Sequence, residues 1–208
     1  MSLVQTQPPQ NTASGFRLVP VDSDDARARW RSDFIGAYQA VFSRAPYFER
    51  FSPAEAEGVW TRLTGTPENI TLIAATPTDQ IVGFGIAIPL RAQAGVAQDL
   101  TGLVSVPDTM YFAEIGVLPK FRGQGVGGAL IRERLRRIDQ ERYSGAVLRA
   151  PASRDGAFEL YSAMGFEEMG VSTDVSTLRT DGRVTTDRRV FLHCILSQLR
   201  LDAAPAVP

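Results

Sequence analysis

The sequence predicts an α+β sandwich in which helices cover a central mixed sheet. Three observations support this fold class. Strand-type and helix-type patterns alternate along the chain, a glycine-rich segment joins an apolar strand to an amphipathic helix, and 208 residues with 44% apolar content suffice for one substantial core. We therefore expect a single domain over residues 15–200, with tails at 1–14 and 201–208 that bury little surface.

The first part of the chain predicts a short strand followed by two helices. Residues 15–21 have a strand pattern, and Ser23 or Asp24 can cap a helix. Its apolar stripe, spaced by three and four residues, consists of Trp30, Phe34, Ala37, Tyr38 and Val41. The segment Ser52-Pro-Ala-Glu55 is a capping box with proline at the first helical position, so a second helix is expected from there to about Gly65.

The middle of the chain predicts a hairpin and a third strand. Apolar runs at 70–75 and 81–90 flank the turn signal Thr76-Pro-Thr-Asp-Gln80, so these runs should pair antiparallel. Residues 91–108 form a polar connection to a strand at 111–117.

The last part predicts two helices and three strands. We expect a helix from Val126 to about Tyr143, a buried strand at 145–150 and a helix at 155–164 that ends at Gly165. Strands at 166–171 and 188–196 should follow, joined by a Thr/Asp/Gly-rich segment. His193 and Cys194 lie among apolar neighbours and are expected to be members of the last strand.

The glycine-rich segment has the features of a phosphate-binding loop. Glycines at 123, 125, 127 and 128 allow a ligand to approach the backbone, and the following helix begins with unpaired N–H donors. The Gly-x-x-x-x-Gly-Lys-Ser/Thr string of nucleotide triphosphatases is absent from the sequence. A dinucleotide fingerprint, G-x-G-x-x-G, is formally present, but residues 118–122 separate it from the strand and too little chain follows for that fold.

Two further patterns carry a family resemblance. Val117-Leu-Pro119 followed by Arg122-Gly-Gln-Gly125-Val-Gly127, and then Leu160-Tyr-Ser-Ala-Met-Gly-Phe166, resemble the motifs of the GCN5-related N-acetyltransferases (GNAT). The resemblance extends over residues 16–196 and is concentrated between 110 and 170. It implies a GNAT-like α/β/α sandwich around a twisted, mostly antiparallel sheet, and acetyl-CoA as cosubstrate.

The resemblance also implies a binding site for the coenzyme. The pyrophosphate would rest on the backbone from Arg122 to Gly127, and the pantetheine arm would lie along the preceding strand. The implied coenzyme-binding residues are Ile115, Gly116, Val117, Arg122, Gly123, Gln124, Gly125, Val126, Gly127 and Arg154. The family commonly has Asn at the position of Arg154, so this assignment departs from the pattern. A bulge or a close backbone approach is expected at Gly116, since a strand glycine often marks one of the two.

Two residues are candidates for catalysis of acetyl transfer. Glu114 is the one acidic residue in its apolar strand, and regular alternation places it on the same face as Phe112 and Gly116. Burial would raise its pKa, as a general base requires, although pairing with an arginine or an ordered water acting as base are alternatives. The resemblance implies that Tyr161 is the general acid that protonates the departing thiolate, and packing is its alternative role.

Composition narrows the function classes. A formal charge of −1 gives no reason to expect nucleic acid as a partner, and the sequence has no signal-peptide pattern or long apolar run, so membrane association is not expected. A single cysteine and a single histidine support neither a disulfide nor a metal site, and a cytoplasmic location is expected.

The sequence leads to one main function and one alternative. The main expectation is an N-acetyltransferase acting on a primary amine of a small molecule or peptide by direct transfer in a ternary complex. The alternative is a non-catalytic acyl-CoA-binding sensor or interaction module with the same fold. The acceptor itself is not specified, and a homodimer is a family-level expectation.

Overall fold

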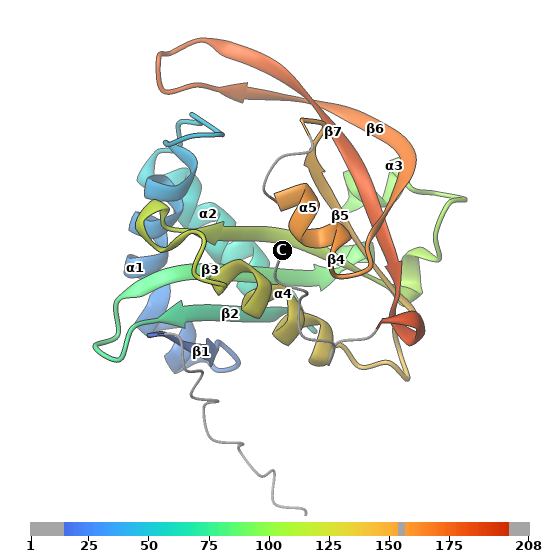
Figure 1. Cartoon of the computed structure of the whole chain (residues 1–208), viewed down its shortest axis with the longest axis horizontal. Helices are drawn as coiled ribbons and strands as arrows, with labels where there is room; N and C mark the ends of the chain where they lie inside the picture. Colours follow the sequence, from blue (N-terminus) through green and yellow to red (C-terminus); the bar gives the residue numbers. More distant parts are fainter. Residues whose placement is uncertain (1–14, 154–156, 200–208) are drawn as a thin grey trace, which may run out of the picture.

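The computed structural model describes residues 15–153 and 157–199, so the predicted tails and Arg154 lie outside the described residues. The strands are β1 (Arg17–Pro20), β2 (Ile70–Ala75), β3 (Ile81–Pro89), β4 (Thr109–Val117), β5 (Gly145–Pro151), β6 (Glu167–Leu178) and β7 (Val184–Ile195). The helices are α1 (Asp24–Phe42), α2 (Pro53–Thr64), α3 (Ala94–Asp99), α4 (Val126–Arg136) and α5 (Ala157–Ser162). The predicted order of elements is confirmed, with α3 added inside the 91–108 connection (Figure 1).

The strands form one mixed sheet in the order β1-β2-β3-β4-β5-β7-β6. Every neighbouring pair is antiparallel except β4 and β5. The parallel pairing of β4 with β5 ends at Phe112 and Leu148. Beyond these residues the two strands separate, so the sheet opens in a V near its centre.

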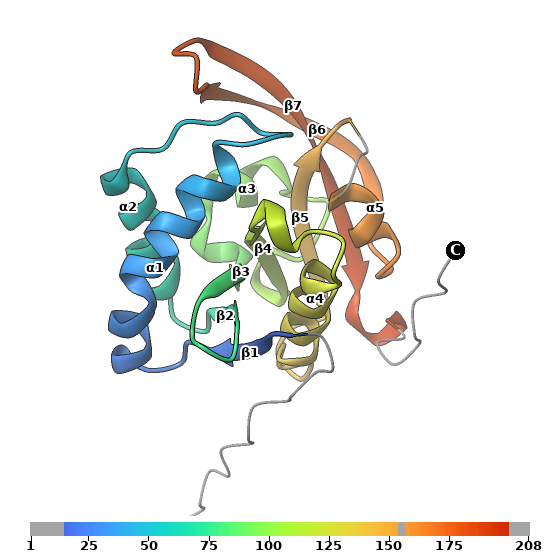
Figure 2. The same ribbon diagram turned by 60° about the vertical axis from the view of Figure 1, so that its left-hand side comes forward.

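Helices cover both faces of the sheet (Figure 2). On one face, α1 and α2 pack on β3 and β4 through an aromatic cluster in which the Phe34 ring lies 4.6 Å from Trp60 and 4.8 Å from Phe84, centroid to centroid. On the other face, α4 packs on β2, β3 and β4, and α5 packs on β5. None of the helices within the described ranges is both long and apolar enough to span a bilayer.

The helix starts follow from local sequence. Ser23 Oγ accepts a hydrogen bond from Ala26 N (3.2 Å) at the start of α1. At the start of α2, Glu55 N donates to Ser52 Oγ (3.2 Å) and Ser52 N donates to the Glu55 carboxylate (2.7 Å), which confirms the predicted capping box.

Helix α4 ends at Arg136 instead of continuing to Tyr143 as predicted. The Asp139 side chain accepts from Glu141 N (3.0 Å) and its carbonyl from Tyr143 N (2.9 Å), so a local turn replaces the helix. Ser144 N then donates to Asp108 O (2.9 Å), which places the chain beside the start of β4, and β5 begins at the next residue, Gly145.

Strands β6 and β7 are much longer than predicted and form a hairpin that projects past the rest of the sheet (Figure 1). The Thr/Asp/Gly-rich segment expected to be a loop is mostly strand, and the turn between the two strands is confined to residues 179–183. The exposure of the side chains alternates along β6, since every second side chain faces the body of the protein.

Candidate functional site

The glycine-rich loop has the backbone geometry that its glycines allow. Gly123 and Gly125 have φ angles of +74° and +79°, in the left-handed region that favours glycine. Gly125 caps α4 without a side-chain hydrogen bond, so the N–H groups of the first turn are not occupied by a capping side chain. Gly127 serves packing, since a Cβ there would lie 2.9 Å from Leu160 Cδ2 on α5.

The side chains at the predicted loop positions point in different directions. Val126 is buried in the core beside Leu130. Gln124 Nε2 donates to Lys120 O (2.9 Å), so this side chain closes the loop on itself. Arg122 Nε donates to Val117 O (3.2 Å) and its Nη1 to Ala45 O (2.6 Å). The guanidinium therefore ties the loop to β4 and to the end of α1.

The edge of β4 turns backbone groups toward β5, where the Val117 carbonyl accepts from Arg122 Nε. Leu118 N donates to Val82 O (2.9 Å) on the β3 side, so antiparallel alternation directs the backbone groups of Val117 and Ile115 away from β3 and into the V. Gly116 lies under the Phe84 ring, where a Cβ would come within 2.3 Å of Phe84 Cζ. Close packing, and not a bulge, is thus the reason for glycine at this position.

A cavity of about 630 Å³ joins the loop to the V. Its walls come from four parts of the chain: residues 45–47, β4, the 121–128 loop and start of α4, and α5 with the end of β5. Ile115, Gly116, Val117, Arg122, Gly123, Gly125, Val126 and Gly127 all line it.

A register shift in β4 decides the direction of Glu114. Ile86 pairs with Glu114 and Ala87 with Phe112, so Ala113 has no partner on β3. Phe112 packs toward α4 and Phe166, whereas Glu114 faces Tyr38 of α1. The expectation that Glu114 and Phe112 share a face was wrong, and of the two alternatives expected at Gly116 the bulge lies three residues earlier, at Ala113.

The Glu114 carboxyl lies in a second cavity of about 440 Å³. Burial raises its pKa to about 7, partly opposed by the positive charge of Arg62, by the Tyr38 hydroxyl and by Arg149. A carboxyl with this pKa exchanges a proton near neutral pH. Tyr38 is itself buried, which raises its pKa, and the Glu114 charge adds to that increase.

Tyr161 lies on α5 and lines the same cavity as Glu114. Its ring packs against Phe166 with centroids 5.3 Å apart, and the side chain is buried. Burial raises the pKa of its hydroxyl, and the charge of Arg134 opposes this effect. The structure thus brings both predicted catalytic residues to one cavity, with Tyr161 neutral at physiological pH.

The buried Arg134 was not among the predicted site residues. Its side chain is fully buried, and its Nη1 donates to Ile86 O (3.2 Å) and Glu114 O (3.1 Å), the carbonyls of the residue pair next to the register shift. The guanidinium stacks on Phe112 at 4.3 Å, and a Cβ at Gly85 would lie 2.9 Å from its Nε. The paired glycines of β3, Gly83 and Gly85, were the available sequence signal for such a close approach.

The two cavities adjoin around Ile115, which lines both together with Tyr47, Pro151 and Ala157. The cavity of Glu114 has walls from α1, from residues 47–55 and from β6. Residues 91–108 are not among the residues that line it. The aromatic residues between positions 38 and 51 are divided: Tyr38, Phe42 and Phe51 pack together in the core, whereas Phe48 is 52% exposed.

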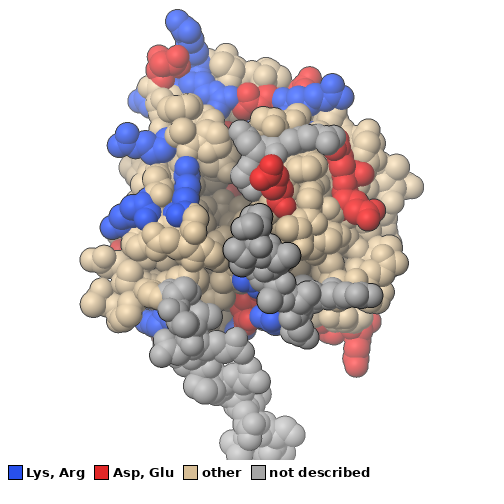
Figure 3. Space-filling view, in the orientation of Figure 1, with Lys and Arg blue, Asp and Glu red and all other residues tan. Residues whose placement is uncertain are grey.

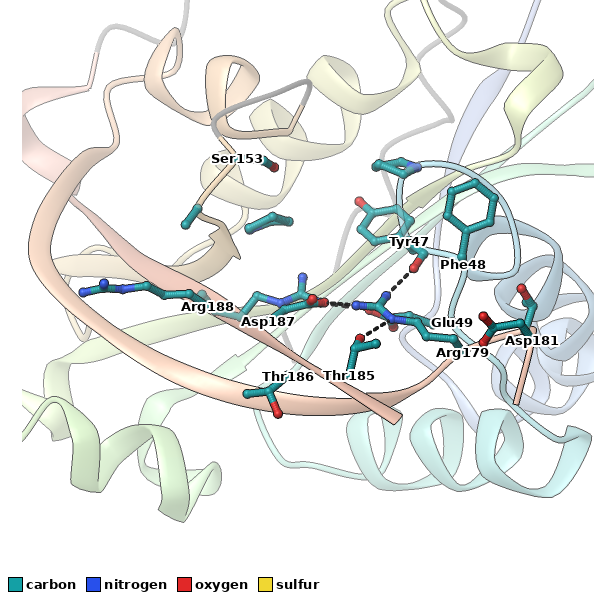
Figure 4. A pocket seen from close by; sticks show the side chains of 15 residues that line it. Tyr47, Phe48, Glu49, Ser153, Arg179, Asp181, Thr185, Thr186, Asp187 and Arg188 are labelled. Carbon is teal, nitrogen blue, oxygen red and sulfur yellow. Dashed lines mark hydrogen bonds and ion pairs between the residues drawn. The ribbon is translucent and has the colours of Figure 1, made fainter. Parts of the chain in front are cut away.

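A third cavity, of about 860 Å³, lies beside the β6–β7 hairpin (Figure 4). Arg179 donates to Tyr47 O and pairs with Asp187, and Arg189 Nη2 pairs with Glu49 (2.8 Å). These contacts attach the hairpin to the segment between α1 and α2. Arg188 points away from the Arg179–Asp187 pair and donates to Ser172 Oγ (2.9 Å).

The sequence of this chain is similar to sequences of known acetyltransferases. Residues 67–168 match the model described as an acetyltransferase (GNAT) domain. A Mus musculus protein of N-acetyltransferase family 8, member 5, is 31% identical over 70 residues. That match covers 34% of this chain and 31% of the mouse protein, so the chain spans about a third of this curated relative.

Solved structures share the fold at low sequence identity. A protein from Acinetobacter baylyi ADP1 is similar with a TM-score of 0.64 at 14% identity, covering 91% of this chain and 97% of its own. A phosphinothricin acetyltransferase from Sinorhizobium meliloti, in complex with AcCoA, gives 0.61 at 18% identity (87% and 88% covered). The ribosomal-protein-S18-alanine N-acetyltransferase from Escherichia coli gives 0.57 at 17% identity (93% and 99% covered). Residues 67–168 thus belong to the GNAT acetyltransferase domain family, and the solved structures share the fold.

Proposed function

We propose that this protein is an N-acetyltransferase that moves the acetyl group of acetyl-CoA to a primary amine by direct transfer. The observation that carries the proposal is the junction of two cavities at Ile115. One cavity contains the glycine-rich loop and the other contains Glu114 and Tyr161. A donor held in the first and an amine in the second would meet at the V between β4 and β5.

The loop would bind the donor through backbone groups. The first-turn N–H groups of α4, with the positive end of the helix dipole, suit a pyrophosphate. Arg122 would add a charge-assisted contact at the loop entrance. The backbone of Ile115 and Val117, directed into the V, would hold the pantetheine amides, and Val117 N–H would donate to the thioester oxygen as negative charge develops there.

Glu114 would act as the general base and Tyr161 as the general acid. Glu114, directly or through a water, takes a proton from the acceptor ammonium, and the neutral nitrogen attacks the thioester carbonyl. The C–N bond forms, the C–S bond breaks and the sulfur receives the Tyr161 hydroxyl proton. The nitrogen, positively charged after the attack, loses its second proton to solvent, which leaves a neutral amide and a free thiol. The proton held on Glu114 then restores Tyr161 through solvent, so the enzyme is regenerated.

Calorimetric titration with acetyl-CoA tests the donor site. We expect micromolar binding by the unmodified protein and loss of binding in an Arg122→Glu, Gly125→Asp double variant, since the new carboxylates would repel and obstruct the pyrophosphate. Absence of binding by the unmodified protein would overturn the proposal. Binding without turnover of any amine would favour the non-catalytic module instead.

A further inference from the structure

Besides Arg149, four other charged side chains line the cavity that contains Glu114: Glu49 and Arg189 pair with each other, whereas Arg50 and Glu55 are exposed. Glu49 accepts from Arg189 Nη2 at 2.8 Å and lies 3.9 Å from Arg179. Glu55 is held by the Ser52 backbone and hydroxyl in the α2 capping box. The Glu49 charge is therefore matched within the protein, whereas the Glu55 carboxylate is exposed to solvent.

Arg149 is different, because no carboxylate of the described residues lies at ion-pair distance from it, and its charge acts on Glu114 only across the cavity. Its Nε donates to the Tyr111 hydroxyl at 3.2 Å, and within residues 15–153 and 157–199 the guanidinium forms no ion pair. A phenol oxygen does not compensate a cation, and the half-buried Arg149 is partly removed from water. The two terminal nitrogens remain for an anion, with the fork geometry that matches a carboxylate.

Arg149 and Glu114 lie on the same face of the sheet, on the two arms of the V. Tyr111 and Val147 are paired across β4 and β5 and both belong to the cluster beneath α1 and α2. Alternation along β5 directs Arg149 to that same face, and the register shift at Ala113 turns Glu114 to it. Both residues line the same cavity.

Arg149 and Glu114 lie on neighbouring strands, just beyond the point at which the pairing of these strands ends. Strands in a sheet lie about 4.8 Å apart, and Arg149 and Glu114 stand one and two residues beyond the last paired positions of their strands. A cation and an anion so placed form a complementary site for a compound with opposite charges separated by a few bonds.

We propose that the acceptor is a free amino acid or a closely similar amino-carboxylic acid, with its carboxylate on the Arg149 guanidinium and its amine toward Glu114. This inference rests on the proposed acetyltransferase function and specifies its substrate class. Two charges would fix the orientation of the acceptor, so the amine would point at the V where the thioester carbonyl arrives. A peptide N-terminus or a simple amine lacks the adjacent carboxylate.

Initial rates with matched acceptor pairs test this inference. The unmodified protein and acetyl-CoA would be offered each L-amino acid, the corresponding amino-acid amide and the corresponding decarboxylated amine, with coenzyme A release as the readout. We expect at least one amino acid to be acetylated with kcat/KM about tenfold or more above that of its amide and of its decarboxylated amine. This is the effect of one charged hydrogen-bonded contact.

Variants at Arg149 assign the preference to this residue. Arg149→Met should bring the acid-to-amide ratio close to one, Arg149→Lys should retain part of it, and the matched control Arg188→Met, outside this cavity, should leave it unchanged. Acetyl-CoA binding should persist in all three, and the panel on the unmodified protein remains decisive if a variant does not fold.

The outcomes distinguish this inference from the proposed function. Equal or better acetylation of amides, simple amines or peptides would overturn the amino-acid assignment and leave the acetyltransferase proposal intact. Acetyl-CoA binding with no turnover of any free amino acid would also overturn it. Failure to bind acetyl-CoA would instead overturn the proposed function on which it rests.

Discussion

The acid–base behaviour of Glu114 depends on the cavity that encloses it. Burial raises the pKa of this carboxyl to about 7 from a reference of 4.5, so its carboxylate population changes around neutral pH. If the carboxylate is the base, kcat/KM should rise with pH up to about 7 and then level off. In Glu114→Gln we expect kcat/KM to lose this rise with pH and to be about 100-fold or more lower.

Thermal unfolding provides the control for Glu114→Gln. The folded pKa lies above the unfolded one, so the native state binds the proton more tightly and the stability contributed by Glu114 is lost as pH rises through about 7. The variant should therefore match the parent protein near pH 4 and exceed its melting temperature near pH 8. A less stable variant at pH 8 would contradict this account of the pKa.

Removal of the Tyr161 hydroxyl distinguishes a role in proton donation from a role in packing. Tyr161→Phe keeps the ring against Phe166 and removes the proton donor. We expect kcat to fall about 100-fold while the dissociation constant of acetyl-CoA changes little, since the hydroxyl acts on the leaving sulfur. An unchanged kcat would assign Tyr161 to packing alone.

At the scale of the element, Arg134 connects α4 to the irregular part of the β3–β4 ladder. Its guanidinium satisfies carbonyls that the register shift leaves beside it, and a Met in its place would leave both without their donor. We expect Arg134→Met to lower the free energy of unfolding by about 3 kcal/mol in denaturant titrations.

Arg137→Met is the matched control on the adjoining turn. Arg137 pairs with Glu133 at 2.8 Å on the surface, and such pairs contribute about 0.5 kcal/mol or less. Equal losses in the two variants would contradict a specific role for the buried guanidinium.

The elements that were predicted closely are those whose signals are local. The capping box at Ser52, the apolar runs of β2 and β3, and the glycine-rich start of α4 depend on residues adjacent in sequence. The long β6–β7 hairpin was underestimated because its Thr, Ser and Asp residues resemble a loop in composition. Cross-strand pairing and packing against residues 47–50 decide otherwise.

At the scale of the whole molecule, the hairpin is attached to the helical layer through Glu49. Charges of both signs lie along the edge of the molecule where the hairpin runs (Figure 3). The buried Glu49 accepts from Arg189 and lies near Arg179, and Glu49 and Arg179 also form an isolated bridge between their backbones.

Neutralising Glu49 should loosen this attachment. Glu49→Gln leaves the Arg179 and Arg189 guanidinium groups with Asp187 as their remaining carboxylate partner among the described residues, and we expect a loss of up to about 3 kcal/mol in stability. Hydrogen exchange should become faster across residues 174–187, while Asp181→Asn at the exposed hairpin tip should leave exchange there unchanged. Unchanged exchange in Glu49→Gln would show that backbone pairing alone holds the hairpin.

The sequence by itself determined the family-type motifs, the order of the elements and the residues of the glycine-rich loop, because these depend on short-range spacing and backbone freedom. Only the tertiary structure decided which groups meet. The unpaired Ala113 turns Glu114 toward Tyr38, the parting of β4 from β5 opens the V, and Arg149 comes to face the same cavity from a strand that is distant in sequence. Strand register and the pairing of remote segments are set by packing over the whole sheet, and no local pattern encodes them.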